Sequence, residues 1–559
     1  MRLPRLTRSL RFVTSVLAGV MLTVTVPAAG QSLPVSARPD APAAATAEAT
    51  GISLPAAQPG PRRSLSIDDA VALALEQNLD IQVERINPQL QDLDIALARS
   101  SWTPVLSTVF QTNGRDTPSN SAIAGGETKI SDSATASSLN VEQQLPWNGA
   151  NYSLTWNSSR STTSNIFSNF NPVLRSNLDF VFVQPLLRNF RIDATRQQLL
   201  VSTNNRDISD IQLRETVVQT VRNVKSAYWN LVYARYSLAV QQQALDLAQE
   251  SLRNNRTRVE VGTMAPIDIV EAESEVARNE EAVILAEAAI ERAEDQLRAL
   301  IFDPSTPDFW ATAIETTEEP TLQMQPIDID SAIRNAVNQR TDLRRAKKGL
   351  ESNDINIRYF HNQTLPDVNL QFNYGFQGLG GTRFERGAGF PGPIIGQTFT
   401  SYGSVLGDIF RNEFPNWNLS LTVGYPIGAS QAEANVAQSR LQRTQAQVQM
   451  KSIELQIATQ VREVARQVNT NLKRVEATRA ARELGERRLE AEQKKFEVGM
   501  STSFLVFQAQ RDLSQGRDAE LRAILDYNQA LVDFEAVQES AISGGGIAVT
   551  TTGATAAQP

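Results

Sequence analysis

Apolar residues recur every three or four positions over long stretches of the chain, as they do along the seam of a coiled coil. One such seam covers 269–300, and a second covers 506–537, 237 residues later. A longer stripe of valine, leucine and tyrosine marks a helix over about 195–260, which spans roughly 100 Å at about 1.5 Å per residue. The pattern predicts long antiparallel helices, whose small seam residues allow close packing.

A glycine interrupts the helical pattern at two equivalent places, Gly262 and Gly499, which are also 237 residues apart. Glycine readily adopts the left-handed conformation that ends a helix. After Gly262 the next helix restarts at once with Pro266, a residue favoured in the first turn of a helix. We therefore expect both glycines at the tips of helical hairpins.

Internal repetition extends over most of the chain. The segment that begins at Ile67 aligns with the one that begins at Ile329, and this offset of 262 places Pro104 on Pro366 without a gap. The predicted first repeat, inter-repeat equatorial segment and second repeat are 64–302, 303–326 and 327–542.

Between the helical segments the hydrophobic period changes to two. Apolar and polar residues alternate over 368–376 and again over 416–425. The first repeat offers four such stretches: 105–111, 139–145, 152–158 and 178–184. Half-buried strands of soluble sheets show this alternation too, but the signal peptide described below, the aromatic-rich apolar faces and the lack of a second hydrophobic layer favour a transmembrane β-barrel. The pattern leaves open whether the hairpin over 139–158 joins the barrel, which would make six strands per chain instead of four.

The two ends of the chain differ from the rest in composition. Arginines, a short apolar run and small residues follow one another in residues 1–30, the order of a secretory signal peptide. An Ala/Pro-rich linker at 31–63 and the tail at 543–559 lack periodicity, so we expect both to be disordered. The signal peptide predicts a protein that acts outside the cytoplasm.

The inventory of reactive side chains is small. The chain has no Cys and a single His, His361, and it shows no constellation of nucleophile, base or metal ligands at a useful spacing. We therefore predict no catalytic, cofactor or metal site. A net charge of −8 argues against nucleic acid as a partner.

Over nearly the whole mature sequence the chain resembles the TolC family of outer-membrane efflux proteins. The matching elements are the repeat openings, the strand boundaries and the two VG tips: LSIDDAVALALEQN and IDIDSAIRNAVNQR, then LPD, QPLL and YPIG. The resemblance implies a mainly α fold with β, in which duplicated coiled-coil hairpins form a periplasmic α-barrel tunnel and a homotrimer shares one transmembrane β-barrel in outer-membrane lipid. It also implies two partners, a periplasmic adaptor (membrane fusion) protein and an inner-membrane transporter.

The resemblance further assigns roles near the hairpin tips. In the family, acidic side chains on the inner helices narrow the tunnel entrance, which here implies Asp268 and Glu271. The equivalent places in the second repeat hold Leu505 and Gln508, a departure from the family pattern. Acidic residues after Pro266 are equally typical of an ordinary helix N-terminus. The residues implied in adaptor contact form the two tips: Val261, Gly262, Thr263, Val498, Gly499 and Met500. A glycine that only supplies the turn would give the same pattern.

Together these features predict a passive conduit with no chemistry of its own. It would be the outer-membrane exit duct of a tripartite efflux or type I secretion system, with a long periplasmic extension. The alternative is a periplasmic coiled-coil adaptor or structural protein, which would share the helical hairpins but gives no reason for duplicated strand segments.

Overall fold

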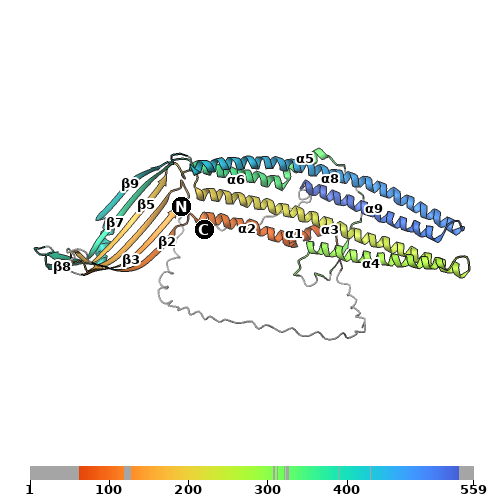
Figure 1. Cartoon of the computed structure of the whole chain (residues 1–559), viewed down its shortest axis with the longest axis horizontal. Coiled ribbons are helices and arrows are strands. Elements are labelled where there is room, and N and C mark those ends of the chain that lie inside the picture. The colour runs from red at the N-terminus through yellow and green to blue at the C-terminus, as the bar shows by residue number, and fades with distance from the viewer. Residues whose placement is uncertain are drawn as a thin grey trace, which may run out of the picture. The chain divides into compact units, whose positions relative to one another are not determined.

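The computed structural model describes residues 62–118, 128–305, 309–310, 312–319, 322, 326–389, 391–428 and 430–539 (Figure 1). All of them belong to one compact unit, Pro59–Pro559. The predicted signal peptide, the predicted tail and nearly all of the predicted linker lie outside the described residues. Of the helices described, none combines the length and the apolar character that a membrane crossing requires.

The helices confirm the duplication. The first repeat contributes α1 (Ile67–Gln77), α2 (Leu79–Ser100), α3 (Ala194–Glu260) and α4 (Ile267–Ile301). The second contributes α5 (Ile329–Gln339), α6 (Thr341–Gln363), α8 (Gln431–Glu497) and α9 (Ser503–Val537). The long helices α3 and α8 have 67 residues each, and α4 and α9 have 35 each. At about 1.5 Å per residue, each long helix measures roughly 100 Å.

Each hairpin is held together by an apolar seam. The first core joins α3 and α4 to α1 and includes Leu231 and Leu297, both fully buried. In the second hairpin Val475 of α8 and Tyr527 of α9 belong to one buried cluster. Burial of these side chains removes apolar surface from water, which is the main stabilising contribution to the hairpins.

A short parallel pair of strands braces the first hairpin. Strand β1 (Arg62–Leu65) pairs with β6 (Ala313–Thr316). The buried Tyr228 hydroxyl of α3 donates to the Leu65 carbonyl at 3.0 Å and accepts from the Thr317 amide at 3.2 Å. The sequence predicted disorder through residue 63 and no strand here, because the partner of β1 lies about 250 residues away and four-residue strands carry no readable period.

The remaining strands form one antiparallel sheet. They are β2 (Val105–Pro118), β3 (Lys129–Gln144), β4 (Asn151–Thr163), β5 (Phe170–Pro185), β7 (Asp367–Arg386), β8 (Ile394–Thr400) and β9 (Phe414–Gly424). Their order is β2-β3-β4-β5-β7, with β9 along one half of β7 and β8 along the other. The hairpin at 139–158 therefore lies within the sheet, as parts of β3 and β4.

The sequence missed β8 and the short helix α7 (Tyr402–Arg411), which packs on one face of β5 and β7. Glycines make this packing possible: a Cβ on Gly378 would lie 2.2 Å from the Val405 carbonyl oxygen, and one on Gly380 would lie 2.4 Å from the Val405 side chain. Val405 and Ile409 of α7 are buried. The glycines that admit α7 also break the alternation in β7, so the sequence pattern gave no sign of either element.

Candidate channel face and tunnel entrance

The sheet has one apolar and one polar face, and the pairing register places like residues side by side. Four aromatic or aliphatic side chains from neighbouring strands form one apolar row: Leu154, Phe180, Tyr374 and Trp417. The adjacent row on the opposite face is polar: Asn140, Thr155, Asp179, Gly375 and Asn416. In this row the Thr155 hydroxyl donates to Asn140 at 2.8 Å. One face thus suits lipid and the other suits water.

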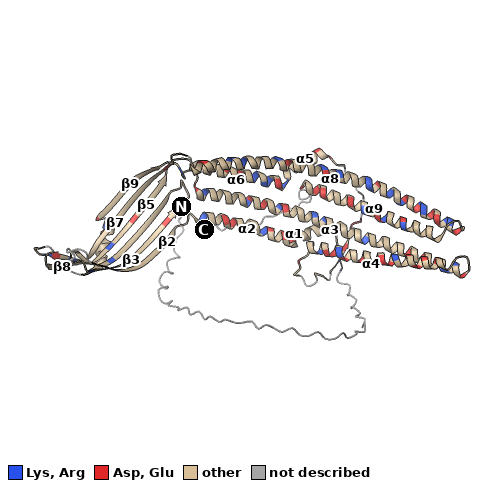
Figure 2. Ribbon diagram, viewed as in Figure 1, with Lys and Arg blue, Asp and Glu red and all other residues tan. Residues whose placement is uncertain are grey.

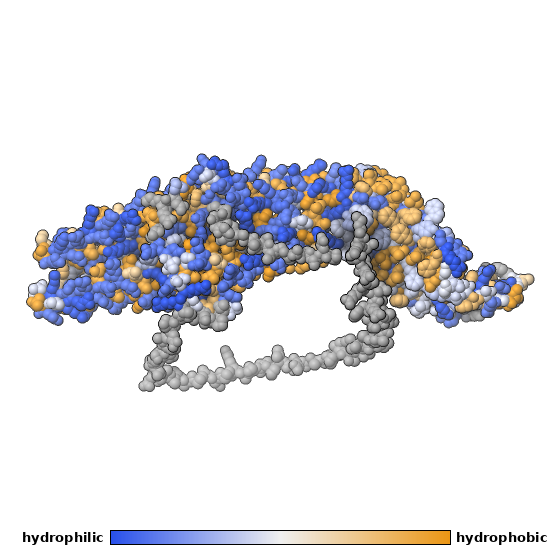
Figure 3. Space-filling view, turned by 180° about the vertical axis from the view of Figure 1, so that it is seen from behind, coloured by the Kyte–Doolittle hydropathy of each residue, from blue (hydrophilic) through white to orange (hydrophobic). Residues whose placement is uncertain are grey.

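Charge is distributed unevenly between the helices and the sheet. Figure 2 shows Lys, Arg, Asp and Glu spread along all the long helices, whereas the strands are mostly uncharged. Figure 3 shows hydrophobic residues gathered over the part of the sheet next to the helices. This separation is what a protein needs if its sheet meets hydrocarbon and its helices meet water.

The predicted glycine tips have the same geometry in both repeats. Gly262 and Gly499 each have φ of +77°, in the left-handed region. The Gly262 amide donates to the Val259 carbonyl at 3.0 Å, and the Thr263 amide donates to the Arg258 carbonyl at 2.9 Å. This is the Schellman arrangement, in which the chain itself satisfies carbonyls at the helix end. The Gly499 and Met500 amides make the matching bonds in the second repeat.

The turn conformation therefore accounts for a glycine at each tip, and open space surrounds it. A Cβ on Gly262 or Gly499 would meet no heavy atom within 4 Å. The neighbouring apolar side chains are exposed: Val261 by 68%, Val498 by 70% and Met500 by 79%. These side chains have no role in the packing of the described residues, so they are free to contact another molecule.

The acidic pair predicted at the entrance bridges the two hairpins. The Ser503 hydroxyl at the start of α9 donates to the Asp268 carboxylate at 2.7 Å and lies 3.4 Å from Glu271. Negative charge beside the N-terminus of α9 is also favourable for the helix dipole. Leu505 and Gln508, one turn along α9, make no corresponding acidic site.

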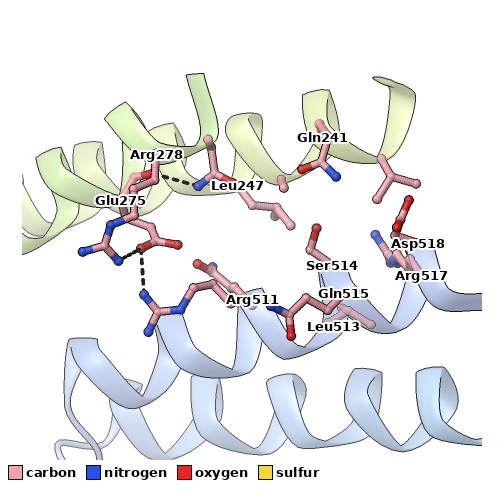
Figure 4. Close-up of a pocket in the computed structure, with 14 residues that line it drawn as sticks. Gln241, Leu247, Glu275, Arg278, Arg511, Leu513, Ser514, Gln515, Arg517 and Asp518 are labelled. Atoms are coloured by element: carbon pink, nitrogen blue, oxygen red, sulfur yellow. Dashed lines mark hydrogen bonds and ion pairs between the residues drawn. The ribbon is translucent and has the colours of Figure 1, made fainter. Parts of the chain in front are cut away.

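A second polar contact between the hairpins has no signal in the sequence pattern. Glu275 of α4 is 5% exposed, and its carboxylate lies 3.0 Å from Arg511 of α9 and 3.4 Å from Arg278. Figure 4 shows this group at one end of a cavity of about 240 Å³ between α3, α4 and α9. In the sequence Glu275 looks like one of the many solvent-exposed acidic residues of α4, and only the packing of the second hairpin buries it.

Polar contacts continue along the α3–α9 boundary. Asp518 of α9 accepts hydrogen bonds from Tyr233 at 3.2 Å and from Ser237 at 3.1 Å. Burial, together with the Asp518 carboxylate, raises the pKa of Tyr233. Further along, Arg222 pairs with Asp533 at 2.6 Å. The boundary between the hairpins combines these polar contacts with apolar ones, because Leu521 and Leu525 of α9 belong to the buried core of α3 and α4.

A sequence model of the outer membrane efflux protein family matches residues 149–301 and 332–537, more than half of the chain. The chain belongs to this family. It is an outer-membrane efflux channel, and both hairpins together with β4, β5, β7, β8 and β9 fall within the match. The resemblance to the TolC family and the duplicated fold are thereby confirmed, and the alternative of a periplasmic adaptor is not.

Solved structures of membrane proteins, outer-membrane channels among them, share the fold of this efflux protein. A membrane protein from Pseudomonas aeruginosa aligns with a TM-score of 0.60 at 16% identity, covering 84% of this chain and 90% of the other. The Campylobacter jejuni CmeC outer membrane channel aligns at 0.58 and 15%, covering 84% and 85%. The open state of the Neisseria gonorrhoeae MtrE channel aligns at 0.56 and 15%, covering 84% and 88%. No curated protein sequence matches the chain.

The buried pair Glu275–Arg511 should contribute to holding the two hairpins together. In the Arg511→Gln variant the nearly buried Glu275 carboxylate keeps only its longer contact, to Arg278. We therefore expect the free energy of unfolding to fall by about 1–3 kcal/mol. We also expect a higher single-channel conductance, because the two hairpins are held together less tightly. Thermal melting and planar-bilayer recording measure the two effects. In the double variant with Glu275→Gln, much of the loss should be recovered; strictly additive effects would contradict coupling across the boundary.

Proposed function

We propose that three copies of this chain form a closed exit duct. The duct crosses the outer membrane through a shared β-barrel, and its helices extend into the periplasm. There it receives cargo from a periplasmic adaptor and an inner-membrane transporter of a tripartite efflux or type I secretion system. Family membership supports the channel, and the contact between the two repeats carries the proposal of a ring.

Inside one chain, the second repeat packs on the first. Helix α6 lies against α3, where Asn204, 5% exposed, donates to the Lys348 carbonyl and to the Ser352 hydroxyl, both at 2.6 Å. Strand β7 of the second repeat pairs with β5 of the first. The chain therefore contains one complete junction between repeats.

The surfaces that would make the next junction are free among the described residues. Strand β2 pairs only with β3, and β9 only with β7, so each leaves one edge open. Helix α2, which leads into β2, exposes an apolar stripe at coiled-coil spacing: Leu79, Val83, Ile86, Leu90, Leu93 and Leu97. Helix α8, which follows β9, exposes a stripe at seven-residue spacing: Leu441, Val448 and Leu455.

The repeat offsets indicate how these stripes meet. Adding 237 to Asn204 gives Leu441, and subtracting 262 from Ser352 gives Leu90. The hydrogen bond between Asn204 and Ser352 inside the chain thus corresponds to an apolar contact between Leu441 of one copy and Leu90 of the next. Because the two surfaces differ, copies join head to tail, and only a closed ring leaves no edge unpaired.

A cysteine pair tests the ring, since the chain has no native Cys. The double variant Leu90→Cys, Leu441→Cys, oxidised in outer membranes or treated with a short thiol crosslinker, should give a covalent product of three times the chain mass. Each single variant should stay monomeric on a denaturing gel. A matched control, Gln89→Cys with Leu441→Cys, moves the thiol off the stripe and should link poorly. A product that stops at two chains would exclude head-to-tail closure.

Neighbouring residues on β5 test the two faces of the sheet. Leu178 lies in the apolar register between Trp156 and Phe376, whereas Asn177 lies on the polar face. Leu178→Arg should cost about 2–4 kcal/mol because its charge would face hydrocarbon, and the yield of heat-resistant trimer in outer membranes should fall. Asn177→Arg should leave the trimer intact and change ion conductance. Equal effects on assembly would show that the apolar face does not contact lipid.

The tips are the proposed adaptor contact, and two substitutions separate contact from turn geometry. Asn tolerates the left-handed conformation, whereas Ala does not and costs about 1–2 kcal/mol at such a position. If an adaptor backbone approaches the glycines closely, Gly262→Asn with Gly499→Asn should keep the trimer and its melting temperature but lose efflux and photo-crosslinking from position 500. The matched variant, Gly262→Ala with Gly499→Ala, measures the additional loss of stability that backbone strain causes. Normal export by the Asn variant would mean that the glycines supply only the turn.

A further inference from the structure

The apolar face of the sheet carries an open groove beside α7. Its volume is about 550 Å³, and its walls come from β2, β3, β4, β5 and α7. Phe110, Leu174 and Tyr402 give it apolar walls. The Tyr402 hydroxyl donates to Ser158 at 2.6 Å, which fixes the aromatic wall against the sheet. Because the glycines beneath α7 allow this helix to pack closely on the sheet, they determine the position of one wall of the groove.

The groove also contains a cation on the face of the sheet that carries the apolar rows. Arg160 lies on β4 with the same side-chain parity as Leu154 and Trp156, and the pairing of β4 is unbroken between them. Within the described residues the Arg160 guanidinium forms no ion pair or hydrogen bond. The hydroxyls of Thr112 and Thr135, 3.1 Å apart, line the groove with it. An uncompensated guanidinium flanked by hydroxyls suits a phosphate.

The height of Arg160 on the sheet agrees with that chemistry. Arg160 pairs with Leu174, which pairs with Gly380, twelve residues beyond Val368 on β7. Val368 and Val423 form the last apolar pair at the end of the sheet next to the helices. Twelve residues of a strand tilted by about 40° rise roughly 30 Å, and the two steps between neighbouring strands from β7 to β4 change this height by about 6 Å, so Arg160 lies at or beyond the edge of an apolar band of about 25 Å. Arg160 is therefore level with the headgroups of the leaflet far from the helices, where a lipid-facing charge costs little.

We propose that this groove binds a phosphorylated membrane lipid from that leaflet. Arg160 binds the lipid phosphate, the threonine hydroxyl whose proton is not used in the bond between Thr112 and Thr135 donates to a phosphate oxygen, and an acyl chain lies against Phe110, Leu174 and Tyr402. The assignment of the leaflet rests on the proposed function, because it requires the sheet to cross the membrane. The lipid phosphate would give the Arg160 guanidinium the counter-charge that hydrocarbon lacks.

Native mass spectrometry of the full-length protein in detergent tests the site. The probes are dioleoyl phosphatidic acid, dioleoylglycerol with the same chains but no phosphate, and inorganic phosphate. We expect the wild type to retain phosphatidic acid in preference to both others, and Arg160→Gln to bind it about tenfold more weakly, as for the loss of one charge-assisted hydrogen bond. A second variant, Ser137→Phe, fills the groove and should also lose the lipid.

The matched control is Arg175→Gln. Arg175 pairs with Ser159, one position from the pair of Arg160 with Leu174, and so lies at the same height on the polar face. This variant should bind phosphatidic acid like the wild type. Equal loss in both arginine variants, or equal retention of phosphatidic acid and dioleoylglycerol, would overturn the proposal. So would binding that appears only after the trimer is dissociated, because a neighbouring copy would then fill the groove.

Failure of the lipid site can be told apart from failure of the ring. Each variant is also made in the Leu90→Cys, Leu441→Cys background and oxidised in outer membranes. If the covalent trimer forms but binding does not depend on Arg160, the lipid site alone is wrong. If no covalent trimer forms in the otherwise unchanged background, the proposed ring is wrong, and with it the leaflet assigned to Arg160.

Discussion

The junction between the two repeats determines which helix faces and strand edges are covered within a single chain and which are left open. Helix α6 packs on one side of α3, and β7 pairs with the edge of β5. The surfaces where the two repeats meet are therefore covered within the chain. The outer sides, α2 with β2 and α8 with β9, have none among the described residues. A duplicated unit whose internal junction is head to tail must either repeat that junction or leave backbone groups and leucines exposed.

The two kinds of helix contact differ in their physical chemistry. Within a hairpin the helices share an apolar seam, which is non-directional and is kept as long as the side chains stay buried. Between the hairpins, ion pairs and hydrogen bonds such as Ser503 with Asp268 and Arg511 with Glu275 add to the apolar contact of Leu521 and Leu525 with the first core. The polar contacts toward the tips have discrete geometries and can exchange for water, so relative motion of the hairpins is expected at the tips first.

Long periodic features could be predicted from sequence, and short or tertiary ones could not. The helix predicted over about 195–260 is Ala194–Glu260 in the structure, because a heptad stripe persists over its whole length. The tips at Gly262 and Gly499 were predicted because only glycine readily adopts their backbone conformation. Strand β8 and helix α7 were missed because glycines needed for close packing interrupt the alternation. The entrance role of Asp268 and Glu271 stays a prediction, and the burial of Glu275 could not be predicted because it depends on a residue 236 positions away.

The exposed leucine stripes also bear on how the protein reaches its final state. Among the described residues, a lone chain has open sheet edges at β2, β8 and β9 and apolar helix faces on α2 and α8, features that promote wrong associations while they are unpaired. The hairpins bury their seams through contacts within one chain, so they can fold first, whereas in the proposed ring the stripes on α2 and α8 are buried only when further copies join. The lifetime of the vulnerable monomer then depends on its local concentration, and stability becomes a property of the assembly instead of the chain.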